Sequence, residues 1–476
     1  MENAAHHFEF LRSALSHEGA HVTTEEVKKW VKARRAATQV TITLIPFAEM
    51  DKWQINEETG NLVHASGGFF SIEGIQVMTN AGITKSWTQP IINQPEIGIL
   101  GFITKKFNGI LHFLIQAKIE PGNINGVQLS PTLQATKSNY SKVHGGKSPH
   151  YLEYFNGSRK RKILLDQLQS EQGARFYKKR NRNIIIETEE DVALHEDFCW
   201  VTLGQIKDLL KEDNLVNMDT RTVISGINYG TYSEESIQLL SGFIYNNPHT
   251  LYHRNELLLS TLDSKRSLKT IEEIISWITG LKGKYEIDVR LVPLNLVSRW
   301  NTTAHEISHE EMKYFSVIAA KVNISSREVT QWCQPLIRSR QDGIIAFIVK
   351  RIHGILHFLV QAKVEAGNLD ILELAPTVQC LTGNYRKGQN EYDVPFLDFV
   401  LSAEDSKILH RSMQSEEGGR FYLEENLNLI LEAPDHFPVD VPENFCWMTL
   451  AQIYKFIQFN NYLNIQSRSL LSVISF

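Results

Sequence analysis

The sequence predicts an α+β protein built by internal duplication, in which each copy mixes strands with helices. Residues 109–118 read Gly-Ile-Leu-His-Phe-Leu-Ile-Gln-Ala-Lys, and residues 354–363 repeat that stretch with a single change. Segments on both sides recur at an almost constant spacing, as Trp30 and Trp277 do. A chain of 476 residues has room for two such units, each with its own core. Two copies at so long a period exclude a solenoid or a propeller, whose units run about 20 to 50 residues.

Each copy is expected to open with a helix and a strand. Thr23 and Glu26 have the spacing of a capping box, in which the threonine caps the helix and the glutamate reaches back to it. Residues 270–273 repeat that pattern. Residues 40–46 and 287–293 alternate apolar residues with others and end in proline, which predicts a strand followed by a turn.

The repeated stretch predicts the central strand of each copy. Its odd-numbered side chains in the first copy are apolar and would face the core, whereas most of the even-numbered ones are polar. Side chains two residues apart in a strand lie about 6.6 Å apart, so the polar row is long enough to follow an extended ligand. The ordinary interpretation is a solvent-facing side, and retention of the row in both copies weakens it without removing it. The row in the first copy is His112, Leu114, Gln116, Lys118 and Glu120.

The second half of each copy is expected to hold a helix, a strand and a closing helix. The first of these helices would span about 164–172 in one copy and 408–417 in the other, and would end at glycine. A strand at 183–187 or 428–432 follows, and then Phe-Cys-Trp and a helix. The expected regions are a first repeat at 1–227 with its N-terminal helix, a helical connector at 228–268 and a second repeat at 269–476.

The composition is that of an ordinary globular protein. Hydrophobic residues make up 42% and charged residues 22%, and a net charge of −5 gives no footprint for general binding to nucleic acid or to anionic membranes. Residues 1–7 do not resemble a signal peptide, and no apolar run approaches about 18 residues, so we expect a cytoplasmic protein. The cysteines form no C-x-x-C pair and are expected to be core thiols in a reducing compartment. They are Cys199, Cys333, Cys380 and Cys446.

Common catalytic and cofactor signatures are absent from the sequence. No G-x-x-x-x-G-K-[ST] or G-x-G-x-x-G lies between a predicted strand and a helix, which gives no indication of a P-loop or of a dinucleotide cofactor. There is also no H-E-x-x-H zinc motif and no G-x-S-x-G nucleophile elbow. We therefore expect neither a cofactor nor a metal site.

Polar residues retained in both copies are the candidates for chemistry, and each has an ordinary structural alternative. Arg175 and Arg420 could fork onto a phosphate or join a surface ion pair. The duplicated tyrosines could act as acids and the duplicated tryptophans could stack a base, but both residue types commonly pack in cores. His112 and His357 could serve as general bases, because an ordinary histidine pKa is about 6.5, or they could be buried structural histidines.

Several long motifs occur in the order found in one known family. They are Glu-Thr-Gly-Asn-Leu-Val-His at 58–64, Gln-Pro-Ile-Ile-Asn-Gln-Pro-Glu at 89–96, the central strand through 121–123, Ser-Pro-Thr-Leu-Gln to Asn-Tyr at 130–140, and 415–422 of the second copy. On these motifs the chain resembles the NDP-hexose 2,3-dehydratases of deoxysugar biosynthesis over nearly its whole length. The resemblance implies two tandem Nudix-like domains, each a mixed sheet flanked by helices, in a homodimer with two nucleotide-sugar pockets per chain. Family members carry tryptophan where Arg175 stands, which makes Arg420 the more secure phosphate ligand.

The resemblance also implies a reaction. The substrate would be an NDP-4-keto-6-deoxyhexose, most often the dTDP form, which would lose the carbon-3 hydrogen and the carbon-2 hydroxyl to give an NDP-3,4-diketo-2,6-dideoxyhexose. A downstream 3-ketoreductase would consume that product. The ketone at carbon 4 acidifies the hydrogen at carbon 3, so one base, one donor to the enolate oxygen and one acid for the departing hydroxide suffice.

The residue chemistry assigns these roles within either pocket. The base is His112 or His357, and the rival candidates for the base are Glu120 and Glu365. The donor to the enolate oxygen is Lys118 or Lys363. The acid that protonates the departing hydroxide is Tyr177 or Tyr422. The expected substrate-binding residues are Trp87, Gln116, Gln134, Asn139, Tyr140, Arg175, Trp200, Arg221, Trp332, Gln361, Gln379, Asn384, Tyr385, Arg420, Trp447 and Arg468.

Two other functions stay open at this point. One is a Nudix-type hydrolase of the sugar diphosphate, and the other is a non-catalytic protein that binds nucleotide sugars. The hydrolase would need magnesium ligands, which Nudix enzymes carry on a helix of the form R-E-x-x-E-E-x-G. The corresponding segment here keeps one carboxylate in the first copy, Glu171, and two in the second, Glu416 and Glu417. An intact magnesium site is therefore not expected.

Overall fold

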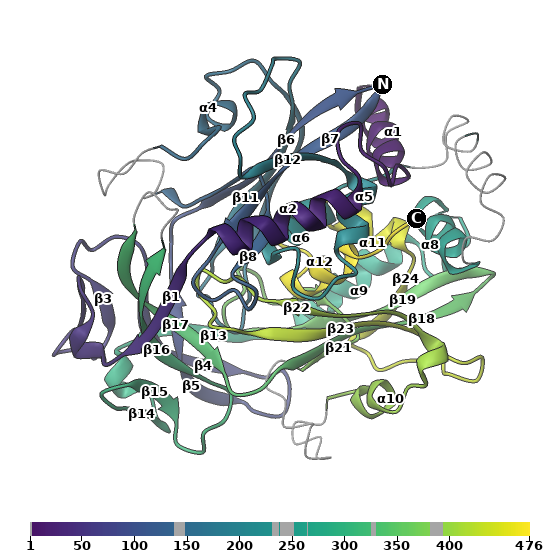
Figure 1. Ribbon diagram of the computed structural model, residues 1–476. Coiled ribbons are helices and arrows are strands. Elements are labelled where there is room, and N and C mark those ends of the chain that lie inside the picture. The colour runs from purple at the N-terminus through teal and green to yellow at the C-terminus, as the bar shows by residue number, and fades with distance from the viewer. Residues whose placement is uncertain are drawn as a thin grey trace.

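The computed structural model describes residues 2–137, 148–230, 238, 252–263, 265–324, 330–380 and 394–476 (Figure 1). In those residues the strands form four sheets, two with seven strands and two with five. Each seven-stranded sheet belongs to one repeat, whereas each five-stranded sheet combines strands of both. The protein is therefore an α+β structure whose two duplicated units are interlocked.

The seven-stranded sheet of each repeat is mixed. The first contains β6 (Gly98–Phe107), β7 (Ile110–Ile119), β8 (Val127–Ser130), β9 (Leu133–Ala135), β10 (Lys162–Ser170), β11 (Arg180–Glu187) and β12 (Phe198–Thr202). The second contains β18 (Gly343–Ile352), β19 (Ile355–Lys363), β20 (Glu373–Ala375), β21 (Val378–Cys380), β22 (Ile408–Ser415), β23 (Glu425–Glu432) and β24 (Phe445–Met448). β11 runs parallel to β6, and β23 runs parallel to β18. The predicted central strands are β7 and β19.

The first strand of each repeat pairs with the other repeat. β1 (Val40–Ile45) lies antiparallel to β16 (Phe315–Ile324), and β13 (Ile287–Val292) lies antiparallel to β4 (Ser71–Thr79). The exchange is reciprocal, so neither five-stranded sheet can form from one repeat alone. These two sheets also contain β2 (Trp53–Ile55), β3 (Leu62–His64), β5 (Ser86–Asn93), β14 (Trp300–Thr302), β15 (Glu306–His309) and β17 (Gln331–Ser339).

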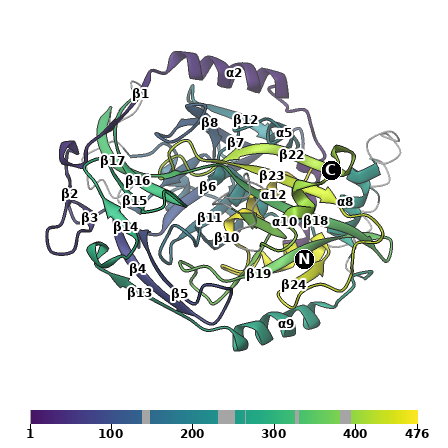
Figure 2. The ribbon, with the colours of Figure 1, turned by 90° about the horizontal axis from the view of Figure 1, so that it is seen from below.

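Two equivalent helices lead into the exchanged strands. α2 (Thr24–Ala37) precedes β1 and α9 (Ile271–Lys284) precedes β13, and Figure 2 shows the two helices at opposite edges of the molecule. The predicted capping box is confirmed in α2, where the Glu26 amide donates to Thr23 Oγ1 at 3.2 Å and the Thr23 amide donates to the Glu26 carboxylate at 2.7 Å. α9 has the same box. These bonds satisfy amides that the first turn of a helix leaves without partners.

The duplication includes a helix that the sequence alone placed in the connector. α1 (Glu2–Ala14) packs against β7, and α8 (Tyr252–Leu262) packs against β19. The Ser13 hydroxyl of α1 donates to a β7 carbonyl at 2.6 Å, and the Ser260 hydroxyl of α8 donates to the equivalent β19 carbonyl at 2.7 Å. α8 is therefore the second copy of the N-terminal helix.

Each repeat closes with helices that join it to the other repeat. α6 packs against α12, and Arg221 of α6 donates to the Ser469 hydroxyl of α12 at 2.9 Å and to the Ser415 carbonyl. One apolar cluster contains Phe102 of the first sheet and Phe347 of the second, so the repeats share a core. The helices are α5 (Leu203–Leu209), α6 (Met218–Ser225), α11 (Leu450–Phe456) and α12 (Ile465–Ser472), with short helices α4 (Leu152–Phe155) and α10 (Leu397–Leu401) and 3-10 turns at Phe47–Glu49, Leu294–Leu296 and Asp405–Lys407.

The helices expected at 164–172 and 408–417 are strands β10 and β22, so that prediction is wrong. Leu164, Leu165 and Leu168 have a spacing that mimics the apolar stripe of a helix. In the structure β10 pairs with β11 and alternates, because Gln167 and Gln169 point inward and bond to each other at 2.9 Å. Pairing with a neighbouring strand outweighs the local pattern.

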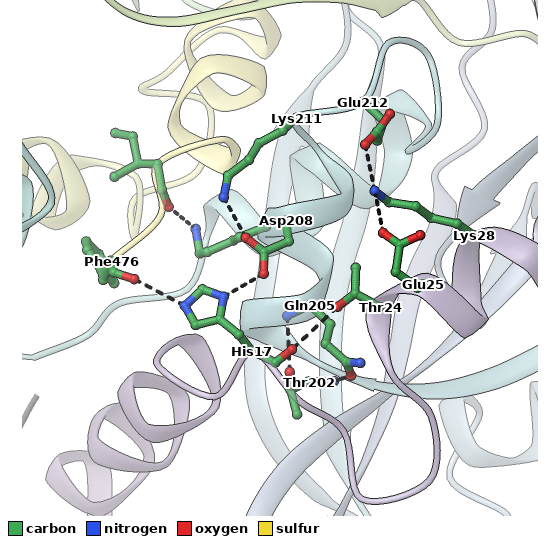
Figure 3. Close-up of polar contacts among 12 residues, drawn as sticks. His17, Thr24, Glu25, Lys28, Thr202, Gln205, Asp208, Lys211, Glu212 and Phe476 are labelled. Atoms are coloured by element: carbon green, nitrogen blue, oxygen red, sulfur yellow. Dashed lines mark hydrogen bonds and ion pairs between the residues drawn. The ribbon is translucent and has the colours of Figure 1, made fainter. Parts of the chain in front are cut away.

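The loop after α1 is anchored to α5 and to the segment after α12. His17 Nδ1 lies 2.6 Å from Asp208 Oδ2, and the other ring nitrogen lies 3.3 Å from the Phe476 carbonyl oxygen (Figure 3). Next to this contact the buried Lys207 ammonium donates to the Ser472 carbonyl at 3.2 Å, and burial lowers the pKa of Lys207 to about 7. The first and last parts of the described chain therefore meet around α5.

The structure places the four cysteines in or at the edge of apolar clusters. All four cysteines carry free thiols, of which Cys199 is partly buried and the other three are buried. Burial raises the pKa of Cys199 and of Cys446 to about 11, which keeps these thiols protonated at neutral pH. Within the described residues, no helix combines the length and the apolar character that a membrane crossing needs.

Candidate active site

A cavity of about 590 Å³ lies at the seven-stranded sheet of the first repeat. Its lining comes from β7, β9 and α6 of that repeat, and from β17 and the turn at 417–420 of the second. The volume is within the range of about 300–1,000 Å³ that is usual for small-molecule pockets. Both copies of the duplication thus complete a single site.

The predicted polar row reaches the cavity only through the second half of β7. Gln116, Lys118 and Glu120 line the cavity. His112 and Leu114 are 1% and 0% exposed and lie in the interior, where both faces of the strand are covered. The ligand-facing part of the row therefore has three residues instead of five.

Gln134 of β9 holds the two charged residues of this row. Its side-chain amide donates to Glu120 Oε1 at 2.7 Å, and Lys118 Nζ donates to its backbone carbonyl at 3.0 Å. The predicted rival base and the predicted enolate donor are thus fixed by a single residue, which itself lines the cavity.

The second repeat brings a further carboxylate to Glu120. The Gly122 amide donates to the Gly418 carbonyl at 2.7 Å, which holds the 417–420 turn against the loop after β7. A Cβ on Gly419 would collide with Glu417 Oε1 and would lie 3.4 Å from Glu120 Oε1. The two carboxylates are therefore neighbours in the space that Gly419 leaves open.

Arg420 is an oriented cation at the same place. Its guanidinium lies over the Phe70 ring, 4.0 Å from the centroid, and donates to Gln94 Oε1 at 3.2 Å and to the Gly419 carbonyl at 2.7 Å. Its Nε has no hydrogen-bond partner among the described residues. A planar, fixed guanidinium with an unused donor suits a phosphate group.

Several ionisable groups of the cavity have shifted pKa values. Burial raises the pKa of Glu417 to about 8, with Arg420 opposing and Glu120 adding to the shift. Burial and the nearby carboxylates hold the pKa of Asp219 well above its usual range. Burial lowers the pKa of Lys179 to about 8. With a pKa of about 8, Glu417 is a carboxylic acid at neutral pH and can donate a proton.

An aromatic wall from the first repeat borders the cavity. The ring centroid of Trp53 lies 4.9 Å from that of Phe70 and 5.3 Å from that of His64, and His64 lies 4.7 Å from Phe69. Trp332 of the second repeat also lines the cavity, and its indole N–H donates to a neighbouring glutamine at 2.7 Å. These rings offer apolar faces to a nucleobase or a sugar.

The histidines of the central strands lie away from the cavity. His112 Nε2 accepts a hydrogen bond from the Ala20 amide at 2.9 Å, and its Nδ1 bonds to the carbonyl two residues before it. His357 does the same with the Leu268 amide at 3.0 Å. Burial lowers the pKa of both, that of His357 to about 4. Because both nitrogens of each ring are bonded to backbone, this placement argues against the predicted general-base role and fits the structural alternative.

Several other predicted site residues are packing or interface residues. The predicted acids, Tyr177 and Tyr422, pack against apolar clusters away from the cavity lining. Trp447 is 1% exposed and Trp200 is 7% exposed, both in core clusters. The guanidinium of Arg468 donates to the Ser170 carbonyl across the repeats, as that of Arg221 does to Ser415. Asn139, Tyr140, Asn384 and Tyr385 lie outside the described residues.

The second repeat holds an equivalent set of polar groups. The Gln379 amide donates to Glu365 Oε1 at 2.9 Å, and burial raises the pKa of Glu365 against the opposing effect of Lys363. The Arg175 guanidinium lies over the Phe315 ring, 4.2 Å from the centroid, as Arg420 does over Phe70. A small cavity of about 170 Å³ borders Glu365. Gln361 of β19 and Trp87 of β5 stand where the first set has Gln116 and Trp332.

Some residues that line the cavity differ between the two copies, so a search for residues kept in both copies does not select them. Lys179, Asp219 and Glu417 line the cavity, but the other copy has Glu424, Gln466 and Gln172 in their places. Sites where the copies differ in charge would have pointed to them. His64 was also missed, although His309 repeats it at the spacing of the central strands and packs against Trp300 as His64 packs against Trp53.

The described residues offer little to a metal ion. No group of three or more His, Cys, Asp or Glu side chains in that part of the chain is arranged to bind one. The segments compared with the Nudix glutamate helix are a strand followed by a turn in both repeats.

Comparisons with known proteins agree with the duplication and with the motifs. A family model described as NDP-hexose 2,3-dehydratase matches residues 24–227 and again residues 271–474. A dTDP-4-dehydro-6-deoxy-alpha-D-glucopyranose 2,3-dehydratase of Saccharopolyspora spinosa is 44% identical over 97% of this chain and 93% of its own length. Enzymes of the same name from Amycolatopsis orientalis and Streptomyces violaceoruber are 42% and 40% identical, over 97% and 94% of this chain and 92% and 95% of their own lengths.

Proposed function

The chain belongs to the NDP-hexose 2,3-dehydratase family, and on that premise we propose that it dehydrates dTDP-4-dehydro-6-deoxyglucose in the cavity of its first repeat. The observation that carries the proposal is the meeting of Glu120, Lys118 and Glu417 in one cavity of suitable size. These are a carboxylate, an ammonium and a carboxylic acid, which are the three groups that an elimination next to a ketone requires.

The reaction can be written with these residues in place of the histidine and the tyrosine. Glu120 takes the proton from sugar carbon 3, and the electron pair forms an enolate whose oxygen, on carbon 4, receives a hydrogen bond from Lys118. The enolate then collapses, the bond from carbon 2 to its hydroxyl breaks, and Glu417 protonates the departing oxygen to give water. The resulting enol tautomerises to the 3,4-diketone. No net oxidation or reduction takes place.

The pKa of Glu417 suits the role of acid. With a pKa raised to about 8 by burial, Glu417 carries a proton at neutral pH, whereas an ordinary glutamate does not. The third carboxyl group, Asp219 of α6, also lines the cavity, and burial and the nearby carboxylates hold its pKa well above the usual range.

Arg420 and the aromatic wall support the binding of a nucleoside diphosphate. Carbons 2 and 3 lie within three bonds of the oxygen that joins the sugar to the diphosphate, so a phosphate must bind close to the base and the acid. Arg420 shares its turn with Glu417 and has an unused Nε donor among the described contacts. Trp332 and Trp53 are the rings against which the thymine would pack.

Further features follow from family membership and remain proposals. They are a Nudix-like fold for each repeat, a second nucleotide-sugar pocket around Glu365, a homodimer, a cytoplasmic location and a 3-ketoreductase as the next enzyme. The mixed sheets with one parallel strand pair and a flanking helix support the first of these. The polar set around Glu365 supports the second.

The product of a coupled reaction tests the function. The protein is incubated with dTDP-4-dehydro-6-deoxyglucose, a 3-ketoreductase and its nicotinamide cofactor, and the sugar nucleotide is analysed by mass spectrometry. Dehydration followed by reduction gives a product with one oxygen atom fewer than the substrate. Release of dTMP only with magnesium would instead identify a hydrolase. Ligand-dependent thermal stabilisation with unchanged substrate would identify a binding protein.

A further inference from the structure

We propose that Asn217 is a positioning residue, which acts through Gln134 to orient Glu120 as the base. This inference rests on the proposed function, because it concerns the residue to which that function gives the carbon-3 proton. The three side chains form a relay that begins at a helix cap and ends in the cavity.

The helix α6 fixes the first member of the relay. Asn217 is the N-cap, and its Oδ1 accepts the Thr220 amide at 2.9 Å. Its backbone amide also donates to the Leu129 carbonyl at 3.0 Å, which fixes the residue against β8. Since Oδ1 must face the helix to cap it, the Nδ2 group has to point away from the helix. The helix thus decides which end of the Asn217 amide faces Gln134.

Asn217 in turn decides the orientation of Gln134. Asn217 Nδ2 donates to Gln134 Oε1 at 3.1 Å, so the oxygen of the glutamine faces α6 and its NH2 group faces the cavity. That NH2 group donates to Glu120 Oε1 at 2.7 Å. With the reversed amide, Gln134 would present an oxygen to the Glu120 carboxylate, and the two acceptors would repel each other.

The relay leaves one oxygen of Glu120 for chemistry. Oε1 is occupied by Gln134, whereas Oε2 is buried and has no hydrogen-bond partner among the described residues. A donor on one oxygen stabilises the charged carboxylate and restricts its rotation. We therefore assign Oε2, the oxygen without a hydrogen bond, as the atom that accepts the carbon-3 proton.

The same relay occurs in the second repeat, which provides a matched control. Asn464 Oδ1 accepts the Ser467 amide at 2.9 Å, and its Nδ2 donates to Gln379 Oε1 at 2.7 Å. Gln379 donates to Glu365 Oε1 at 2.9 Å, and Glu365 Oε2 likewise has no partner in the described part of the chain. The two relays are built alike, but only the first ends beside Glu417 and Asp219.

The replacement Asn217→Asp separates the relay from the helix cap. Aspartate caps a helix as well as asparagine does, so α6 should remain intact. The new carboxylate has no NH2 group and accepts the NH2 of Gln134 instead, so Gln134 turns its oxygen towards Glu120. We expect kcat to fall at least about tenfold with little change in KM, because geometry at the base affects the chemical step.

Three comparisons make the outcome decisive. Asn464→Asp should keep the kcat and the KM of the wild type, with a thermal shift like that of Asn217→Asp. Asn217→Ser, which caps the helix without adding charge, is the second variant should Asn217→Asp fold poorly, and it should also lower kcat. Equal kcat losses at both caps, or a rise in KM that accounts for the whole loss of kcat/KM in the Asn217 variants, would overturn the relay. If Glu120→Gln kept full activity, the base assignment itself would fail, and that result is distinguishable from a failure of the relay alone.

Discussion

The two polar sets share a scaffold and differ in charge. In both, a strand carries Gln and Lys two residues apart, and a Glu follows two residues after the Lys, just beyond the strand. A helix cap reaches this glutamate through a glutamine, and an arginine lies over a phenylalanine. The first set adds Glu417 and Asp219, where the second has the neutral amides of Gln172 and Gln466. The shared parts could hold a ligand in both sets, but Glu417 and Asp219 have acidic equivalents nowhere in the second set. On the proposed function, the catalytic difference between the two sets lies at these positions.

The third difference concerns the cation. Lys179 in the first set faces Glu171 and Arg420, whereas Glu424 stands at its place in the second and faces Arg175. A diphosphate in the first set would therefore lie near two basic residues, Lys179 and Arg420, whereas one in the second set would lie near Arg175 and the acidic Glu424. The comparison predicts that the first set turns over substrate and that changes in the second set affect turnover much less.

The largest expected effect comes from removing the base. Glu120→Gln keeps the shape and the Gln134 contact but cannot accept the proton, so kcat should fall about 10²–10⁴-fold. Glu365→Gln is the matched control and should leave kcat in the same order of magnitude as the wild type. Steady-state rates with the coupled reductase measure both variants. A larger loss at Glu365 would place catalysis in the second repeat.

The next effect comes from making the first set resemble the second. Glu417→Gln copies Gln172 and removes the proposed acid, which should lower kcat about 10²-fold. In the wild type the acid must be protonated, so kcat should decline as the pH rises through about 8, the value to which burial raises the pKa of Glu417. The variant should lack that decline. A basic limb that persists in the variant would show that another group is the acid.

The smallest expected effect on turnover is at the central histidines. His112→Gln and His357→Gln each disturb a buried hydrogen bond to backbone, which should lower the free energy of unfolding by about 1–3 kcal/mol. Their kcat values should stay near that of the wild type. Thermal denaturation and rate measurements on both variants check this. A tenfold or greater loss of kcat confined to His112 would restore histidine as the base.

The sequence was informative where local rules act and where the duplication could be read directly. The capping box at Thr23 and the strand at 40–45 depend on neighbouring residues, and both were predicted. The helix expected at 164–172 failed because pairing with β11, which the local pattern does not encode, decides the conformation of β10. The pairing of β1 with a strand of the other repeat could not be predicted either, because the sequence of an apolar strand does not specify its partner strand.

Part of the cavity lining consists of residues that were selected because both copies keep them. Lys118, Glu120, Gln134 and Arg420 are such residues, and their roles in catalysis and binding stay predictions. The same criterion selected His112, which is kept in both copies for packing, and it passed over Asp219. One chain without its fold cannot separate residues retained for structure from those retained for chemistry, because both recur at the same spacing.

The reciprocal pairing of β1 with β16 and of β13 with β4 has a consequence for any attempt to divide the chain. A fragment ending near residue 230 would keep β1 as an arm without a sheet. Its β4 would still pair with β5, but the edge that pairs with β13 in the intact chain would be open. Open edges of this kind recruit other strands. Two such fragments should therefore associate, with β1 of each pairing with β4 of the other. The resulting symmetrical dimer would resemble the pairing of the two repeats in the intact chain.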